Sequence, residues 1–340
     1  MKKVLVLGYF GYKTNQLDGQ TVKTRNILNL LKTTDNEVTY YDTQEFKYDR
    51  LSILRMFTLV CQSDFICYLP AHNNLKYIFP IVFILSKLFG NTLLYFVVGG
   101  WLVEFLQNLP LHRWMLKHIK AIFPETKMMC ECLSSNYGIT RTHVFPNFRI
   151  TNYIPPQSSV STGPLRLLFM ARINKQKGYE SVFSLVSYAM EVGMNISVDF
   201  YGPINNDDYQ DFNERLACCP TAKYKGVLNP DEIYTVLSQY DLMLLPTRYY
   251  TEGFPGSILD AYIAGIPVIV TEWKHAREFV LDGKTGYVVP FDSFQDAINS
   301  KVEFLYYNRQ VLQRMKDDSR EYSKEFQSYR ALQIIADYIV

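Results

Sequence analysis

Apolar residues along the chain fall into short runs that alternate with longer stretches of helical periodicity. Residues 4–8 form the first run, which is closed by Gly8, and a glycine-containing loop and a helical pattern over residues 21–32 follow it. This order of strand, loop and helix is the opening of a Rossmann-like unit. The order repeats in both halves of the chain, which predicts α/β structure with mostly parallel sheets.

The later runs predict the other elements. We expect strands at residues 37–41, 65–69, 92–98, 165–170, 195–201, 242–245 and 268–271. Helices are expected over residues 77–89 and 179–192, from near residue 256, and through 302–340. Residues 77–100 are the most apolar stretch, but Lys87, Gly90 and Asn91 interrupt it. We therefore interpret this stretch as a core helix and a buried strand, not as a membrane span.

A segment rich in proline, serine and glycine divides the chain at residues 155–164. Such a composition leaves no helix or central strand, so we expect a linker here. The 340 residues are enough for two domains. We predict an N-terminal Rossmann-like domain over residues 1–155 and a C-terminal one over residues 165–324. A helix at residues 325–340 is expected to pack back on the N-terminal domain.

Composition agrees with a folded protein, since 48% of the residues are apolar and 20% are charged. None of the six cysteines forms a C-x-x-C pair and no secretory signal opens the chain, so we expect a reducing, cytoplasmic setting. Residues 1–160 carry 17 Lys and Arg against 10 Asp and Glu, a net charge of +7, whereas the remainder carries −5. This asymmetry indicates that the N-terminal half faces an anionic partner, and no nucleic-acid-binding motif is present.

The densest group of functional residue types lies at residues 251–270. A loop with two glycines precedes a helix that is expected to begin near Gly256, and the first-turn amides of such a helix bind phosphate oxygens. Glu252 lies in the loop, and Asp260 lies inside the helix. Two carboxylates do not neutralise a phosphate, but they accept hydrogen bonds from hydroxyl groups that flank a diphosphate. The alternative is that both acids only favour a helix N-terminus.

A second group follows the strand expected at residues 165–170. Arg172 and Lys177 emerge at the carboxyl end of this strand, where open α/β sheets bind ligands. Both side chains are cations suited to a diphosphate. A solvated basic loop is the alternative for this pair taken alone, and its combination with the acidic helix favours a diphosphate site.

The order of these motifs resembles the donor domain of family 4 glycosyltransferases, which have the GT-B fold of two Rossmann-like domains facing a central cleft. The motifs are Arg172-x4-Lys177-Gly178, Tyr201-Gly202-Pro203, Gly226-x-Leu228, Glu252-Gly253-Phe254-Pro255, Gly265-Ile266-Pro267-Val268 and Asp282-Gly283-Lys284-Thr285-Gly286. They stand in the family's order over about 115 residues, which is more specific than a lone glycine motif. Residues 95–102 and 145–148 are similar to members that act in capsule and surface-polysaccharide synthesis.

The resemblance implies a retaining transfer of a sugar from a nucleotide-diphosphate sugar to a saccharide acceptor. It implies that Arg172 and Lys177 hold the diphosphate and stabilise charge on the leaving nucleotide, and that Glu252 contacts the donor sugar. It also implies donor contacts at Gly19 beside the phosphates, Gly202, Leu228 at the base, Phe254, Pro255, Gly256 and Ser257 at the sugar or phosphate, and Asp260 at the ribose.

Two positions depart from the family pattern. The second acidic position usually holds Glu, whereas this chain has Asp260. The family often carries a histidine at the end of an N-domain strand, whereas this chain reads Gly99-Gly100-Trp101 at the matching position. We therefore take Gly99, Gly100 and Trp101 as acceptor-side candidates that offer backbone groups. His72 follows another predicted strand, and we expect it to be structural or solvent-exposed.

Neither a metal ion nor a cofactor is expected. The chain has no Asp-x-Asp and no His/Cys cluster with zinc spacing, and Arg172 and Lys177 can supply the positive charge that a magnesium ion would otherwise bring. A dinucleotide oxidoreductase is disfavoured, because the first glycine loop lacks G-x-G-x-x-G. The open alternatives are a sugar-nucleotide epimerase or phosphorylase on the same fold, and a non-catalytic partner subunit that binds a nucleotide sugar.

Residues 111–123 combine basic side chains with Trp, Leu, Ile and Phe at helical spacing. A helix with this pattern either packs its apolar stripe on the domain or lies on an anionic membrane. Together with the charge of the N-terminal half, the pattern favours peripheral association with the inner face of the cell membrane. A lipid-diphosphate-linked saccharide would be a natural acceptor there.

Overall fold

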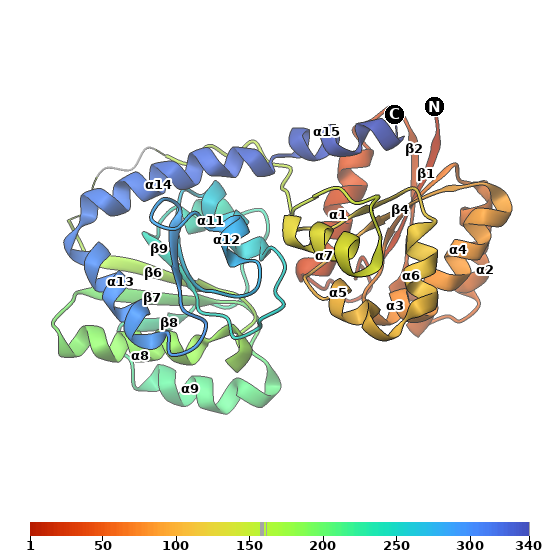
Figure 1. Cartoon of the computed structure of the whole chain (residues 1–340). Coiled ribbons are helices and arrows are strands. Elements are labelled where there is room, and N and C mark those ends of the chain that lie inside the picture. Colours follow the sequence, from red (N-terminus) through yellow and green to blue (C-terminus); the bar gives the residue numbers. More distant parts are fainter. Residues whose placement is uncertain (157–159, 161, 340) are drawn as a thin grey trace. The chain divides into compact units, whose positions relative to one another are not determined.

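The computed structural model describes residues 1–156, 160 and 162–339, which form two compact units (Figure 1). The first unit comprises Met1–Thr151 and Phe326–Val340, and the second comprises Asn152–Glu325. The linker expected at residues 155–164 belongs to the second unit, and its residues 157–159 and 161 lie outside the described residues, as does Val340. Both units are α/β with a parallel sheet, which confirms the predicted fold class.

The first unit contains a five-stranded sheet in the order β2-β1-β3-β4-β5, and all its strand pairs are parallel. The strands are β1 (Lys3–Gly8), β2 (Glu37–Asp42), β3 (Phe65–Leu69), β4 (Thr92–Phe96) and β5 (Ala121–Phe123). The strand order reverses between β1 and β3, so this unit has a doubly wound topology.

Helices cover both faces of the first sheet, because alternate residues of each strand point to opposite sides. Leu5 and Leu7 of β1 pack with one set of helices: α2 (Ser52–Gln62), α3 (His72–Tyr77), α4 (Phe79–Phe89), α5 (Leu102–Phe105), α6 (Pro110–Lys117) and α7 (Lys127–Tyr137). Val4 and Val6 pack on the other face with α1 (Gly19–Leu31) and the C-terminal α15 (Ser328–Ile339). The last helix of the chain thus completes the core of the first unit (Figure 1).

Three expectations for the first unit need correction. The helix expected over residues 77–89 begins two residues later, as α4 at Phe79 with a proline in its first turn, because Tyr77 ends the preceding helix α3. The strand β4 ends at Phe96, before the expected residue 98. The helix expected over residues 111–123 ends at Lys117, and Ala121–Phe123 form β5, since these buried residues pair with β4.

A buried ion pair ties α1 to the loops that follow β4 and β5. The Lys23 ammonium lies 2.8 Å from Glu125 Oε1, and both side chains are 1% exposed. Lys23 also donates to the carbonyl oxygens of Val97 (2.9 Å) and Phe145 (3.4 Å). Burial lowers the pKa of Lys23, and the Glu125 carboxylate opposes this shift. No sequence signal marked this pair, because a single lysine in an amphipathic helix is normally exposed.

The second unit contains a six-stranded parallel sheet in the order β11-β10-β9-β6-β7-β8. Its strands are β6 (Leu165–Met170), β7 (Ile196–Tyr201), β8 (Ala222–Tyr224), β9 (Leu242–Leu245), β10 (Val268–Thr271) and β11 (Gly286–Val289). Read from β8 to β11, this is the 3-2-1-4-5-6 order of a Rossmann fold, and the order reverses between β6 and β9.

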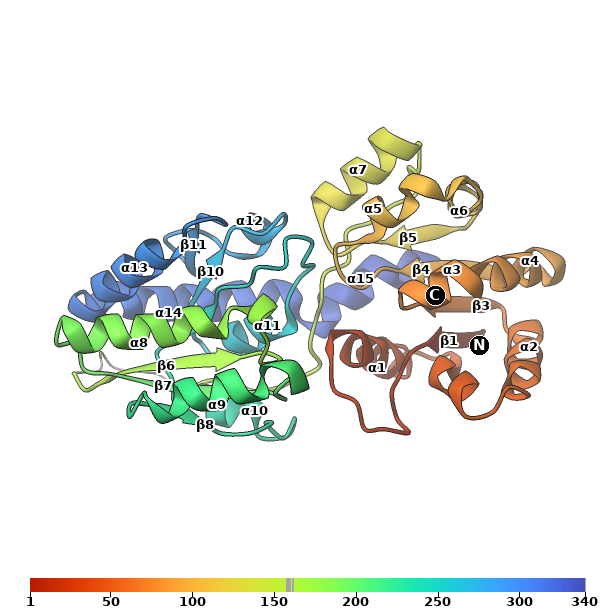
Figure 2. The ribbon, with the colours of Figure 1, turned by 90° about the horizontal axis from the view of Figure 1, so that it is seen from below.

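The helices of the second unit are α8 (Tyr179–Glu191), α9 (Tyr209–Ala217), α10 (Ile233–Leu237), α11 (Gly256–Ile263), α12 (Ala276–Phe279), α13 (Gln295–Tyr307) and α14 (Arg309–Ser323). Figure 2 shows α8 and α9 across one face of β6 and β7, and their buried side chains share one core with these strands. The helical segment expected over residues 302–340 begins earlier, at Gln295, and is divided into α13, α14 and α15.

The apolar stretch at residues 77–100 contains a helix and a strand that contribute to the core, as expected, but part of α4 faces solvent. Val82 of α4 and Leu94 and Tyr95 of β4 are fully buried in the first unit. None of the helices in the described ranges combines the length and the hydropathy that a membrane span requires.

Candidate functional site

Two loops meet at the carboxyl edge of the second sheet. Residues 171–178 follow β6, and residues 246–255 follow β9. Because the strand order reverses between these two adjacent strands, their loops diverge and leave the crevice in which open α/β sheets bind ligands. The residues nominated from sequence, Arg172, Lys177 and Glu252, all belong to these loops.

Lys177 and Glu252 form an ion pair in this crevice. The Lys177 ammonium lies 2.5 Å from Glu252 Oε2, and the two side chains are 22% and 15% exposed. The hydroxyl of the fully buried Thr247 can donate to the same Oε2 at 3.3 Å. Both hydrogen bonds that described residues donate to this carboxylate thus end on Oε2. Oε1 is left to accept a hydrogen bond from a ligand. The ammonium likewise keeps donors for an anion.

The two loops are held together by backbone contacts. Arg248 N donates to Gln176 O at 2.7 Å, and Asn174 Oδ1 accepts from Lys177 N at 2.8 Å. Gly178 has φ +79°, and a Cβ atom at this position would lie 2.0 Å from Pro246 O. Only glycine permits this approach, so the spacing between Lys177 and Glu252 depends on backbone packing as well as on their own charges.

Arg172 and Gly202 lie on neighbouring segments after β6 and β7. The Arg172 side chain is exposed, and no described residue forms an ion pair with it. Gly202 has φ +132°, and a Cβ atom there would lie 1.9 Å from Ala171 O. Gly202 therefore supports the backbone that carries Arg172, which gives this glycine a structural role in addition to any contact with a donor.

The segment before α11 mixes core and ligand-facing groups. The Phe254 ring is buried and stacks on Phe279 with a centroid distance of 4.1 Å, so its side chain belongs to the core. Pro255 occupies the N-cap position, and no side chain caps the helix. Gly256 and Ser257 begin the first turn and are partly exposed. A first turn without a side-chain cap is suited to an anion.

Asp260 lies inside α11, as expected, but its carboxylate has a protein partner. The side chain is 6% exposed, and the Tyr234 hydroxyl donates to Asp260 Oδ1 at 3.3 Å. The Tyr234 ring packs against that of Tyr153 in a tilted arrangement, with a centroid distance of 5.4 Å. A ribose hydroxyl would share this carboxylate with the phenol of Tyr234. Leu228, nominated for the base, is partly exposed in the loop after β8.

The remaining nominated residues belong to the first unit. Gly19 is the first residue of α1, which Asp18 caps, and a Cβ atom at Gly19 would meet no neighbour. Gly99 has φ +82° and lies against Trp101. The Trp101 ring packs near His72, with a centroid distance of 5.1 Å. The acceptor-side candidates therefore lie beside an aromatic cluster at the carboxyl ends of β3 and β4.

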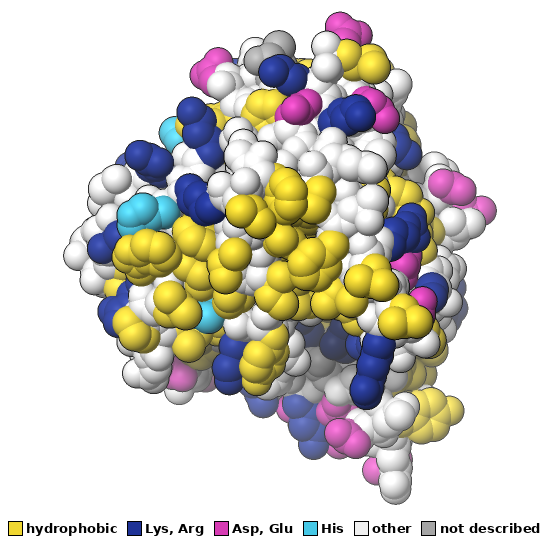
Figure 3. Space-filling model, turned by 90° about the vertical axis from the view of Figure 1, so that its right-hand side faces the viewer, with side chains coloured by type: hydrophobic (Ala, Val, Ile, Leu, Met, Phe, Trp, Pro, Cys, Tyr) yellow, Lys and Arg dark blue, Asp and Glu magenta, His cyan; other side chains and the backbone are white. Residues whose placement is uncertain are grey.

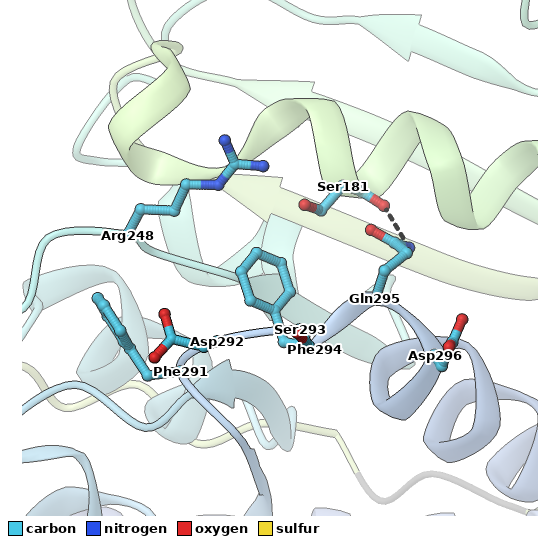
Figure 4. A pocket seen from close by; sticks show the side chains of 8 residues that line it. All are labelled: Ser181, Arg248, Phe291, Asp292, Ser293, Phe294, Gln295 and Asp296. Atoms are coloured by element: carbon cyan, nitrogen blue, oxygen red, sulfur yellow. Dashed lines mark hydrogen bonds between the residues drawn. The ribbon is translucent and has the colours of Figure 1, made fainter.

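A surface pocket of about 460 Å³ in the second unit is lined in part by Arg248 of the loop after β9 (Figure 4). Its lining residues are Ser181, Arg248, Phe291, Asp292, Ser293, Phe294, Gln295 and Asp296. No nominated residue lines it. Arg248 pairs with Glu180 at 3.2 Å, and Gln295 donates to Ser181 O at 3.1 Å, as Figure 4 shows for the latter. The arginine is thus already partnered, and the pocket carries no cluster of groups that would suit the diphosphate.

Two residues of the site were not nominated from sequence. The Thr247 hydroxyl lies within hydrogen-bond distance of both Glu252 Oε2 (3.3 Å) and Gln176 O (3.2 Å) and can donate to either, so it links both loops. Its position directly after the strand 242–245 and Pro246 was a signal that could have identified it. Tyr234 carried no such signal, because it belongs to none of the sequence motifs and reaches Asp260 only through the packing of α10 against α11. Among described residues, no group of three or more His, Cys, Asp or Glu side chains could hold a metal ion.

Comparison with known proteins bears on the second unit most directly. Residues 152–322, just over half of the chain, match the family model described as glycosyl transferases group 1. An uncharacterized 41.2 kDa protein in the cps region of Klebsiella pneumoniae is 28% identical over 149 residues, which are 44% of this chain and 38% of that protein. The capsular polysaccharide biosynthesis glycosyltransferase CapM of Staphylococcus aureus is 23% identical over 137 residues, which are 40% of this chain and 35% of CapM. The matches span less than half the length of these relatives.

A solved structure is similar over the whole chain. The crystal structure of Anabaena HepE in complex with UDP-glucose has a TM-score of 0.75 at 14% identity, and the match covers 99% of both chains. This likeness confirms the predicted GT-B fold class of two parallel-sheet α/β domains. Because the family model spans more than half of the residues, the chain belongs to the glycosyl transferases group 1 family.

Proposed function

We propose that this chain is a retaining, metal-independent glycosyltransferase that moves a sugar from a nucleotide-diphosphate sugar to a saccharide acceptor in surface-polysaccharide synthesis. The observation that carries the proposal is the Lys177–Glu252 pair at the reversal point of a Rossmann sheet. The relatives support the setting, since one is encoded in a cps region and another is named for capsular polysaccharide biosynthesis. UDP-glucose in HepE supports a nucleotide-sugar donor.

In the proposed reaction the bond between the sugar C1 and the diphosphate oxygen breaks, and its electron pair leaves with the nucleoside diphosphate. Lys177 and Arg172 stabilise the charge that develops on this leaving group, which is the larger part of the catalytic work that fixed cations can do. Glu252 Oε1 accepts a hydrogen bond from a hydroxyl of the donor sugar and so orients the sugar. An acceptor hydroxyl oxygen then bonds to C1, and its proton passes to a phosphate oxygen of the leaving nucleoside diphosphate. Retention of configuration follows from the family 4 resemblance.

The acceptor is proposed to be a saccharide linked to a lipid diphosphate at the inner face of the cell membrane. The excess of basic residues in the N-terminal half supports an anionic partner. The aromatic cluster of His72, Trp101 and Phe105 supports a saccharide, because aromatic faces pack on the apolar faces of sugar rings.

The donor is tested by thermal unfolding with UDP, dTDP, GDP and ADP sugars. A donor that binds only the native state raises the unfolding free energy by about 2.7 kcal/mol at a concentration of 100 times its Kd. We expect one base class to raise the Tm, and the corresponding nucleoside without phosphates to have little effect, because it offers nothing to Lys177. Absence of any shift with all four classes would refute the donor site. Donor turnover that needs no acceptor would favour an epimerase instead.

Transfer is expected to continue at the same rate in excess EDTA. The cations of Lys177 and Arg172 take the place that a divalent ion fills in metal-dependent transferases. The measurement is the initial rate of nucleoside diphosphate release with acceptor present, in EDTA and in added Mg²⁺. A rate that collapses in EDTA and returns with Mg²⁺ would contradict metal independence without affecting the donor assignment.

A further inference from the structure

Three neighbouring helices of the first unit expose large apolar side chains. Leu54 of α2, Ile84, Leu88 and Phe89 of α4, and Leu111 and Trp114 of α6 have exposed fractions between 49% and 73%. We call these six residues the apolar face. Single exposed apolar residues are ordinary in soluble proteins, whereas a contiguous group marks an interaction surface.

The apolar face is continuous. The helix α4 packs against α2 on one side and against α6 on the other. The rings of Phe83 and Trp114 meet edge to face with a centroid distance of 5.7 Å, which joins α4 to α6. Figure 3 shows apolar side chains gathered across this side of the molecule, with basic and some acidic side chains around them.

The sheet of the first unit does not need these six side chains. The same helices bury a different set in the core, including Met56 of α2, Val82 of α4 and Met115 of α6. Ile84 and Leu88 are four residues apart on α4, so they lie on one face of that helix. Each helix therefore has an apolar side that packs on the sheet and a second apolar side that faces solvent.

The charged residues of these three helices are all basic, and one of them, Arg55, pairs with Glu45 at 3.3 Å. The helices α2, α4 and α6 contain Arg55, Lys87, Arg113 and Lys117 but no Asp or Glu. Residues 50–120 as a whole carry seven Lys and Arg against two acids. The Lys87 ammonium lies 5.4 Å from the centroid of the Phe83 ring, so its stem follows the apolar surface and its charge reaches the margin.

We propose that the apolar face docks on an anionic phospholipid bilayer. Apolar side chains that enter the acyl boundary and cations that meet anionic headgroups are the two features of an interfacial surface. A protein partner would need a complementary acidic surface and would normally leave mixed charges at the rim. The inference extends the proposed function. It rests on that function only because a lipid-linked acceptor would explain why the protein docks on a membrane.

The surface differs from the helix that the sequence indicated. Leu111 and Trp114 come from the expected segment at residues 111–123, but Ile119 is buried and Ala121–Phe123 form a strand. The larger part of the apolar face comes from α4, which was expected as a core helix, and from α2, for which the sequence pattern gave no prediction.

The test measures binding of the full chain to sedimented vesicles. We expect binding to vesicles of phosphatidylcholine mixed with phosphatidylglycerol, weaker binding to phosphatidylcholine alone, and weaker binding at high salt. The double variant Ile84→Glu/Leu88→Glu should lose about tenfold or more in partition, because it places two charges in the acyl boundary. Replacing Lys87 or Lys117 with Gln should lower the partition onto anionic vesicles about fivefold in each case.

Met190→Glu is the matched control, since Met190 is 57% exposed on α8 of the second unit. It should bind vesicles like the unmodified chain. Failure of the unmodified chain to bind anionic vesicles, or equal binding by the double variant, would overturn the proposal. Self-association that the double variant abolishes, without vesicle binding, would instead make the face an interface between copies. Tm shifts with nucleotide sugars, measured on the same variants, should be unchanged, so failure of the docking surface is distinguishable from failure of the donor site.

Discussion

Replacing Lys177 with alanine is expected to lower kcat for sugar transfer by about 10²- to 10³-fold, the usual cost of removing one preorganised donor from a developing charge. The ammonium lies in the crevice between the loops after β6 and β9, is partly exposed, and is held by Glu252 at 2.5 Å. In the proposed reaction it stabilises the departing diphosphate more than the intact donor. The loss should therefore appear mainly in kcat, with a smaller rise in KM.

The matched control is Lys175→Ala. Lys175 lies two positions away in the same loop, but its side chain is 56% exposed and pairs with Glu180 at 4.0 Å. Its removal should change the transfer rate less than about threefold, since exposed ion pairs contribute little. Equal losses in both variants would mean that general loop charge matters and not the Lys177 position. Unchanged transfer by Lys177→Ala, with an unchanged Tm, would remove Lys177 from the mechanism.

The Lys23→Met variant is expected to lose about 3–5 kcal/mol of unfolding free energy, because it removes the ammonium that neutralises the buried Glu125 carboxylate. Both side chains are 1% exposed, and Lys23 also satisfies the carbonyl oxygens of Val97 and Phe145. Urea unfolding at neutral pH measures the loss.

The double variant Lys23→Met/Glu125→Gln separates charge from packing. It removes the buried carboxylate charge as well, so it should recover part of the lost stability, although two carbonyl oxygens remain without the lysine donor. Arg55→Met is the control for an exposed pair, since Arg55 lies 3.3 Å from Glu45 with a side chain 58% exposed. It should cost less than about 1 kcal/mol. If Lys23→Met proves as stable as Arg55→Met, the buried Lys23–Glu125 pair is not required for the stability of the fold.

Much of the fold was predictable, because strands and helices of an α/β domain have a local signature. The run at residues 242–245 and the run at 268–271 are strands β9 and β10 with those bounds. The failures came where one pattern fits two structures. The apolar residues 121–123 continue the periodicity of α6, but they pair with β4 and become β5. A short apolar run does not distinguish a helix end from a buried strand.

The site was predictable in part for a similar reason. Lys177 and Glu252 were identified by residue type and by their positions after apolar runs, and the structure brings them into contact. Tyr234 was not identified, because its hydrogen bond to Asp260 depends on how α10 packs against α11. Phe254 was nominated for its backbone amide, and the structure adds that its ring is a core group stacked on Phe279.

The sequence by itself determined the alternation of strands and helices, the two α/β units and the residue types at the ends of the strands. These features follow from side-chain periodicity and backbone propensity, which act over a few residues. Only the tertiary structure decided which ends meet. Lys177 and Glu252 are 75 residues apart and touch because β6 and β9 are adjacent in the sheet. The apolar face likewise exists only because α2, α4 and α6 lie side by side, and the burial of each of their side chains depends on that packing.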